Sequence, residues 1–158
     1  MSTNDVAGDA RSVRPGDELD WSRIEAYVRS EIDGLGDGMD VRQFVHGTAN
    51  LTYLLRLGDR ELVLRRPPFG ALPPGAHDMR REFTVLSRLW QAYDRAPRAF
   101  AFCDDPSVAG ADFFVMEYRT GVVVRDEIPA ALGGSAAGRE VGTAFVDAVA
   151  ELHLVDAE

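Results

Sequence analysis

Three consecutive strand-like segments constrain the fold of this chain most strongly. They are Val41–Val45, Leu51–Leu57 and Glu61–Arg65. In the second segment, leucine and tyrosine side chains recur at every other position, which places them on one face of an extended strand. The turns that join the segments are short, and short turns connect antiparallel neighbours. The sequence therefore predicts an antiparallel sheet.

The first of the two turns, residues 46–50, has the sequence His-Gly-Thr-Ala-Asn. Its small polar side chains and its glycine let the backbone approach another molecule closely. The second turn, Gly-Asp-Arg, has the ordinary composition of a β-hairpin. This difference suggests a ligand site at Gly47, Thr48, Ala49 and Asn50. The alternative is that Gly47 merely permits a tight hairpin.

Two helices and two further strands are predicted around these segments. In each helix, apolar residues recur at intervals of three and four, and the strands are apolar runs bounded by turn residues. The four elements are Trp21 to about Asp33, His77–Tyr93, Ala99–Cys103 and Asp112–Tyr118. Asp20 is a good N-cap for the first helix, and Glu82 lies on the flank of the second, where it can turn toward the third strand. The predicted fold class is α+β, a five-stranded antiparallel sheet with one main packing helix plus an N-terminal helix.

The chain divides into three predicted parts. Residues 1–19 are rich in Ser, Asp, Gly, Ala and Arg without an apolar period, which is typical of a disordered leader. Deletion of this leader is expected to leave thermal unfolding unchanged. Residues 20–118 form the α+β domain, and residues 119–158 hold a connector and a helix from Arg139 to Leu154. That helix has an apolar stripe that includes Phe145, so we expect it to be mobile or to self-associate.

Several residues that can carry chemistry in other contexts are interpreted as structural. Gly34, Gly36 and Gly38 follow a helix, whereas a dinucleotide-binding loop lies between a strand and a helix, so they are interpreted as a linker. Cys103 ends an apolar run and is interpreted as a small core residue. The scattered histidines show no metal-binding spacing. They are His46, His77 and His153.

Composition restricts the partners and the compartment. The net charge of -9 argues against nucleic acid or an anionic membrane as a partner, because both require a basic face. The single cysteine fits a reducing compartment. The sequence shows neither a signal-peptide pattern nor a long apolar stretch. We therefore expect a cytoplasmic protein.

Four motifs occur in an order and spacing that resemble a known family. They are GTANLTY, VLRRPP, HDMRREF and FFVMEY. Together they are similar to the N-terminal lobe of aminoglycoside-phosphotransferase-like small-molecule kinases, which are distant relatives of protein kinases. The resemblance runs from Val41 to Tyr118 and continues more weakly to His153. It is closest to the branch found fused to acyl-CoA dehydrogenases, whose members also carry an arginine-proline stretch after the third strand.

The resemblance implies a lobe that binds ATP. The turn would lie over the phosphates, although it has one glycine where protein kinases use three. Arg65 occupies the position where many kinases have a lysine, and Glu82 matches the glutamate that pairs with it; the alternative is a solvated surface pair. Arg66 should point to the opposite face. The residues implied in nucleotide binding are Gly47, Thr48, Ala49, Asn50, Arg65, Glu82, Met116, Glu117, Tyr118 and Arg119.

The family's catalytic motifs do not occur in this sequence. The His-Gly-Asp loop, its downstream asparagine and the metal-binding aspartate are missing, and Asp156 ends a helix without an asparagine after it. The resemblance thus implies the ATP-binding lobe of a phosphotransferase that acts on a hydroxyl-bearing small molecule. We expect this chain alone to be inactive, with Mg²⁺ bound only in a full-length enzyme. The alternative is a non-catalytic nucleotide-binding or protein-interaction domain derived from such a lobe.

Overall fold

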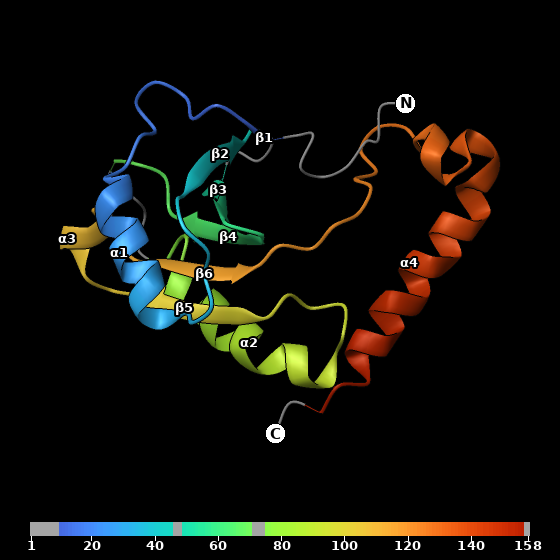
Figure 1. Cartoon of the computed structure of the whole chain (residues 1–158). Coiled ribbons are helices and arrows are strands. Elements are labelled where there is room, and N and C mark those ends of the chain that lie inside the picture. Colours follow the sequence, from blue (N-terminus) through green and yellow to red (C-terminus); the bar gives the residue numbers. More distant parts are fainter. Residues whose placement is uncertain (1–9, 46–48, 71–74, 157–158) are drawn as a thin grey trace.

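The computed structural model describes residues 10–45, 49–70 and 75–156. Within this part, six antiparallel strands form one sheet in the order β1-β2-β3-β4-β6-β5 (Figure 1). The strands are β1 (Ala10–Arg11), β2 (Asp40–Phe44), β3 (Leu51–Leu57), β4 (Arg60–Arg66), β5 (Ala99–Cys103) and β6 (Phe113–Glu117). Five of them are the predicted strands. The α+β class is therefore confirmed, and the sheet gains one short edge strand.

The prediction of a disordered leader is wrong for residues 10–19, because this segment runs along the edge of the sheet. Its strand β1 pairs with β2. The Gln43 side chain, which is only 1% exposed, donates a hydrogen bond to the carboxylate of Asp17 (2.7 Å). The hydroxyl of buried Tyr53 donates to the backbone carbonyl of Asp17 (2.7 Å). Polar bonds hold the segment together with two apolar residues, Val13 and Leu19, that pack on the core without a regular period. Periodicity in the sequence could therefore not reveal this segment. Residues 1–9 lie outside the described residues.

Helix α1 (Trp21–Glu31) covers one face of the sheet. The Asp20 side chain caps it by accepting from the backbone amide of Arg23 (3.2 Å), as predicted for this N-cap. On its inner side, Ile24 and Val28 are fully buried. Beneath the helix lie Tyr53, Leu55, Leu57, Leu62, Leu64, Phe113 and Val115. This layer is the main apolar core of the protein.

Helix α2 (Met79–Ala92) covers the opposite face. Two consecutive residues of β6 show this arrangement, because neighbours on a strand point to opposite faces. Phe113 packs against Tyr27 of α1, with ring centroids 5.4 Å apart. Phe114 packs against Phe83 of α2, at 6.4 Å. The sheet is therefore a middle layer between two helices.

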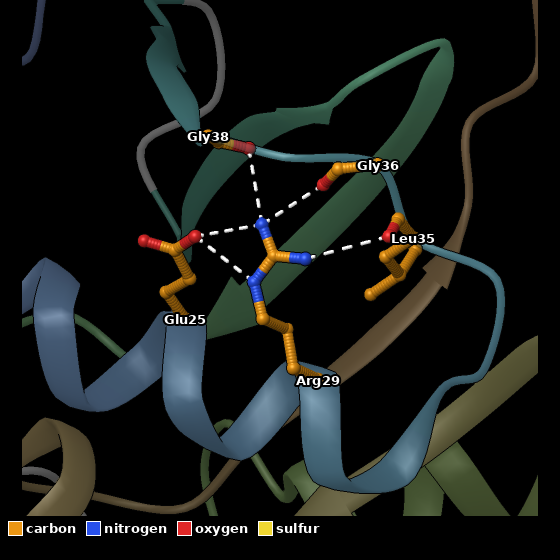
Figure 2. A network of polar contacts seen from close by, with 5 residues as sticks. All are labelled: Glu25, Arg29, Leu35, Gly36 and Gly38. Carbon is orange, nitrogen blue, oxygen red and sulfur yellow. Dashed lines mark hydrogen bonds and ion pairs between the residues drawn. The ribbon is translucent and has the colours of Figure 1, made fainter.

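The loop after α1 is fixed by an arginine (Figure 2). The guanidinium of Arg29 donates to the carbonyls of Gly36 (2.9 Å) and Gly38 (3.3 Å), and it also reaches the carbonyl of Leu35 (3.5 Å). The carboxylate of Glu25 pairs with the same guanidinium at 2.7 Å. A phosphate-binding loop presents backbone N–H donors to an anion, whereas this loop presents carbonyl oxygens to a cation. The geometry agrees with the interpretation of these glycines as a linker.

The C-terminal helix α4 (Gly138–His153) stands apart from the sheet and approaches the far end of α2 (Figure 1). The hydroxyl of Tyr93 donates to the carbonyl of Ala148 (2.9 Å). None of its residues is buried, and Phe145 and Val146 are 69% and 64% exposed. Among the described residues, the other helical segments are α3 (Pro106–Ala109) and two 3-10 turns, Ala130–Leu132 and Gly134–Ala137. In the described part of the chain, we find no helix that is long and apolar enough to cross a membrane.

Candidate functional site

An arginine and a glutamate from facing elements meet on the α2 side of the sheet. Arg65 lies on this side because its neighbours Leu64 and Arg66 face α1. Its Nε atom lies 3.1 Å from the Oε2 atom of Glu82, in the first turn of α2. Asp78 caps the helix by accepting from the amide of the third helical residue (2.9 Å), which fixes where this first turn begins. The structure thus brings together the arginine and glutamate selected from the sequence.

The ion pair borders an open pocket. The pocket has a volume of about 370 Å³ and is lined by Arg65, Arg81, Glu82, Val85 and Leu86. The side chains of Arg65 and Glu82 are 36% and 30% exposed. An ion pair of this exposure contributes about 0–1 kcal/mol to stability. The pair adds little to stability, and its cation remains accessible to a ligand in the pocket.

Asn50 and His77 extend this pair into a four-residue polar cluster. The side-chain amide of Asn50, just before β3, lies within 2.6 Å of the Nδ1 atom of His77. With its oxygen toward Arg65, the amide accepts from Nε (3.0 Å) and Nη2 (2.9 Å), and its nitrogen donates to Nδ1. With the opposite orientation, its nitrogen faces Glu82 Oε1 at 3.4 Å. The first orientation satisfies more partners, and the hydrogen-bond network is the proper basis for assigning an amide.

His77 is the functional candidate that sequence reasoning missed. It was interpreted as structural because no metal-binding spacing surrounds it. In the structure it has a φ of 55°, a left-handed backbone conformation that is uncommon for residues other than glycine. One signal in the sequence was available, because a good N-cap residue, Asp78, follows directly and fixes His77 at the entrance of α2.

The remaining predicted residues lie at the end of β6 or at the first turn. Met116 is opposite Val63, on the same face as Arg65. The amide of Glu117 donates to the carbonyl of Arg98 (2.8 Å), so this donor is already used within the protein. The ring of Tyr118 stacks on Phe44, and Arg119 donates to the carbonyls of Asp94 (2.6 Å) and Ala96 (2.9 Å). Ala49 and Asn50 precede β3, whereas Gly47 and Thr48 lie outside the described residues.

Arg66 points away from this site, to the α1 face, as alternation along the strand predicts. It is only 2% exposed, and its guanidinium lies 4.1 Å from the ring centroid of Phe69. Burial lowers the pKa of this guanidinium, and the nearby Tyr53 and Asp17 oppose the shift. The two consecutive arginines therefore have different surroundings: Arg65 borders the pocket, and Arg66 is buried.

The surroundings of Cys103 match its interpretation as a small core residue. Cys103 is 3% exposed, and burial raises the pKa of its thiol, so little nucleophilic thiolate forms near neutral pH. Among the described residues, no three His, Cys, Asp or Glu side chains are grouped so that they could hold a metal ion.

The antiparallel sheet, with its strand-to-helix Arg–Glu pair, defines the class of this protein as a kinase-like lobe. Residues 40–158 match the family described as the phosphotransferase enzyme family (APH). A crystal structure from Ralstonia eutropha, provisionally designated an aminoglycoside phosphotransferase, has a similar fold. Its TM-score is 0.57, with 29% sequence identity over 69% of this chain and 30% of that chain. The chain belongs to the phosphotransferase enzyme family.

The curated relatives are acyl-CoA dehydrogenase family members, as the resemblance to the fused branch predicted. The chain is 36% identical to member 10 from Mus musculus, over 92% of this chain and 14% of the relative. It is 35% identical to member 11 from Homo sapiens, over 92% of this chain and 19% of that relative. A third relative, the probable acyl-CoA dehydrogenase IBR3 of Arabidopsis thaliana, is 38% identical over 54% of this chain and 11% of that relative. The chain thus spans a fifth or less of these relatives.

Proposed function

We propose that this chain is the ATP-binding lobe of a small-molecule phosphotransferase. The observation that carries the proposal is the accessible Arg65–Glu82 pair beside Asn50, at an open pocket. Family membership supports the reaction class, which is transfer of the terminal phosphoryl group of ATP to a substrate hydroxyl. That reaction is proposed for a longer protein that contains this lobe.

Arg65 would offset the charge of the phosphates. A guanidinium is always charged and has five N–H donors in a planar fork. Asn50 and Glu82 engage its Nε and Nη2 atoms, so donors remain for phosphate oxygens. All permanently cationic side chains of the chain are arginines, since the sequence contains no lysine. The electrostatic task of the usual lysine would therefore fall to Arg65, with a different geometry.

The end of β6 would receive the adenine. Met116 lies on the same face as Arg65 and would border the base. Because the amide of Glu117 is used by Arg98, a backbone donor for the base would come from Arg119. The stack of Tyr118 on Phe44, with ring centroids 6.4 Å apart, would form one wall.

The described residues do not fit a Mg²⁺ site, because they contain no suitable group of carboxylates. Magnesium and the acceptor hydroxyl would be held by other parts of a longer protein. Phosphoryl transfer relies almost entirely on positioning and charge stabilisation, so this chain alone is expected to give no turnover above background.

The composition of the chain supports proposals about its partners and its cellular compartment. A net charge of -9 disfavours nucleic acid and anionic membranes as partners, and the single cysteine suits the reducing cytoplasm. The proposed small-molecule partners are ATP and an unidentified hydroxyl-bearing acceptor.

An NMR titration tests ATP binding. ATP, added up to millimolar concentration, should shift the backbone amides at Ala49 and Asn50 and those at residues 117–119. Arg65→Met should weaken binding about tenfold or more, because a charge-assisted hydrogen bond contributes about 1.5–3 kcal/mol. Arg80→Met is the matched control, because Arg80 pairs with Asp104 on an exposed surface away from the pocket. If ATP shifted none of these amides, the proposal would fail.

The second candidate is a non-catalytic interaction domain. The exposed Phe145 and Val146 on α4 favour it, because they form an apolar surface that a second copy of the chain could cover. Concentration-dependent self-association without any response to ATP would support this candidate over the first.

A further inference from the structure

We propose that His77 is a positioning residue that sets the orientation of the Asn50 amide and thereby decides whether Asn50 holds Arg65. The inference deepens the proposed function, because Arg65 is the proposed phosphate contact. It rests on three observations: the 2.6 Å contact between Nδ1 of His77 and the amide, the reach of that amide to Arg65, and the left-handed backbone of His77.

The state of Nδ1 decides which end of the amide faces the imidazole. A neutral imidazole with an unprotonated Nδ1 accepts a hydrogen bond, so the Asn50 nitrogen must face it. The Asn50 oxygen then accepts from Nε and Nη2 of Arg65 at 3.0 and 2.9 Å. In this state both Asn50 and Glu82 hold the guanidinium.

A proton on Nδ1 reverses the arrangement. The imidazole then donates, so the Asn50 oxygen must turn toward it. The Asn50 nitrogen would face the Glu82 carboxylate at 3.4 Å and would lie against the donor atoms of Arg65. Two donors in contact repel each other, so Arg65 would keep only its ion pair with Glu82. The amide thus acts as a two-position relay between His77 and Arg65.

The relay changes its position when a proton binds to the Nδ1 atom of His77. Among the described residues, the charged groups on the elements around it are Arg65 on β4, together with Asp78, Arg80, Arg81 and Glu82 at the start of α2; Arg80 pairs with Asp104. The proton comes from solvent, and no covalent step is involved.

Two substitutions at position 77 test the role of the imidazole without changing the backbone conformation. Glycine and asparagine both tolerate a φ of 55°, so neither His77→Gly nor His77→Asn strains the chain. Asparagine places a polar atom near the position of Nδ1 but does not titrate. Glycine removes the contact altogether.

The experiment follows the side-chain NMR signals of Asn50 and Arg65 in the ligand-free protein as the pH is lowered from 8 to 5. Both signals should shift in step with the imidazole of His77. In H77N, the Arg65 signal should stay at its high-pH position over the whole pH range. In H77G, the Arg65 signal that belongs to the Asn50-bound state should be absent at every pH. The proposal is overturned if the signals ignore the titration of His77, or if the step persists in H77N.

A second arm measures ATP affinity at pH 8. H77N should bind within about twofold of the unaltered chain, and H77G several-fold more weakly, because one of the two groups that hold Arg65 is lost. If ATP does not bind at all, the proposed function fails, but the ligand-free signals still decide whether His77 sets Asn50. Equal affinities of H77G and the unaltered chain would contradict the link to Arg65.

Discussion

Two side chains with polar groups, Tyr53 and Gln43, lie fully buried on the α1 face and share one hydrogen-bond acceptor residue in the N-terminal segment. Tyr53 and Gln43 are 0% and 1% exposed, and both donate hydrogen bonds to Asp17, one to its carbonyl and one to its carboxylate. Burial raises the pKa of Tyr53 to about 12, and the charge of Asp17 adds to the shift. A buried hydroxyl without its acceptor is costly, so these bonds tie the segment to the sheet.

The Tyr53 shift predicts a loss of stability at alkaline pH. Tyrosine in the unfolded chain ionises near pH 10, whereas in the folded protein the pKa of Tyr53 is about 12. The stabilisation is complete below about pH 10 and is lost as the pH rises through 12. Between these values, the free energy of unfolding should fall by about 1.4 kcal/mol per pH unit from this residue alone. Denaturant unfolding at pH 9–12 measures this effect. In Tyr53→Phe, the fall in the free energy of unfolding with pH should be shallower by that amount, and an unchanged fall would contradict the raised pKa of Tyr53.

At the scale of elements, the loop after α1 and the β3–β4 turn touch through glycines. A Cβ atom added to Gly36 would lie 2.8 Å from the Cα of Gly58, in the β3–β4 turn. Arg29 holds the first loop in place through its carbonyls, so that loop cannot easily move away. The contact requires glycine for close approach and explains why this linker is fixed against the hairpin.

Gly36→Ala should therefore destabilise the protein by about 1–3 kcal/mol, because overpacking against backbone atoms forces one loop to shift. Gly121→Ala is the matched control: a Cβ there meets nothing within 4 Å, and its φ is not in the left-handed region. The control should change the free energy of unfolding by less than about 0.5 kcal/mol. Denaturant unfolding of both variants measures the difference. Equal values for the two would show that the loops separate at little cost.

At the scale of the whole molecule, other parts of the chain cover both faces of the sheet and its β2 edge. Helices α1 and α2 cover the faces, and residues 10–19 cover the edge. Val13 and Leu19 pack against the main core as well. An unpaired edge strand exposes backbone donors and acceptors, so this segment also protects the edge from other chains.

Removal of residues 10–19 should lower the melting temperature by several degrees or more, contrary to the expectation from the sequence. It would remove β1 and leave Tyr53 and Gln43 without their acceptors. Comparison of a chain that lacks residues 1–9 with one that lacks 1–19 isolates the contribution of the described segment. Differential scanning calorimetry should show the lower melting temperature only in the second. Identical melting temperatures would mean that the segment adds nothing to stability.

The candidate site could be predicted from the sequence only where its residues belong to regular elements. Alternation along β4 separates the face of Arg65 from that of Arg66, and the helical period puts Glu82 on the flank of α2. The role of His77 could not be predicted, because its contact with Asn50 joins residues 27 positions apart through loop conformations. Such conformations depend on the packing of both loops and leave no periodic pattern.

The sequence by itself determined the five main strands and both packing helices, because each buries an apolar face with the period of its own structure. The same reasoning assigned residues 10–19 to a disordered leader, because their polar bonds and the packing of Val13 and Leu19 follow no regular period. Only the tertiary structure decided that Asp17 completes the core, that Gly36 meets Gly58 and that His77 reaches Arg65 through Asn50. These are pairwise contacts between distant parts of the chain, and their energies exist only once the sheet has brought those parts together.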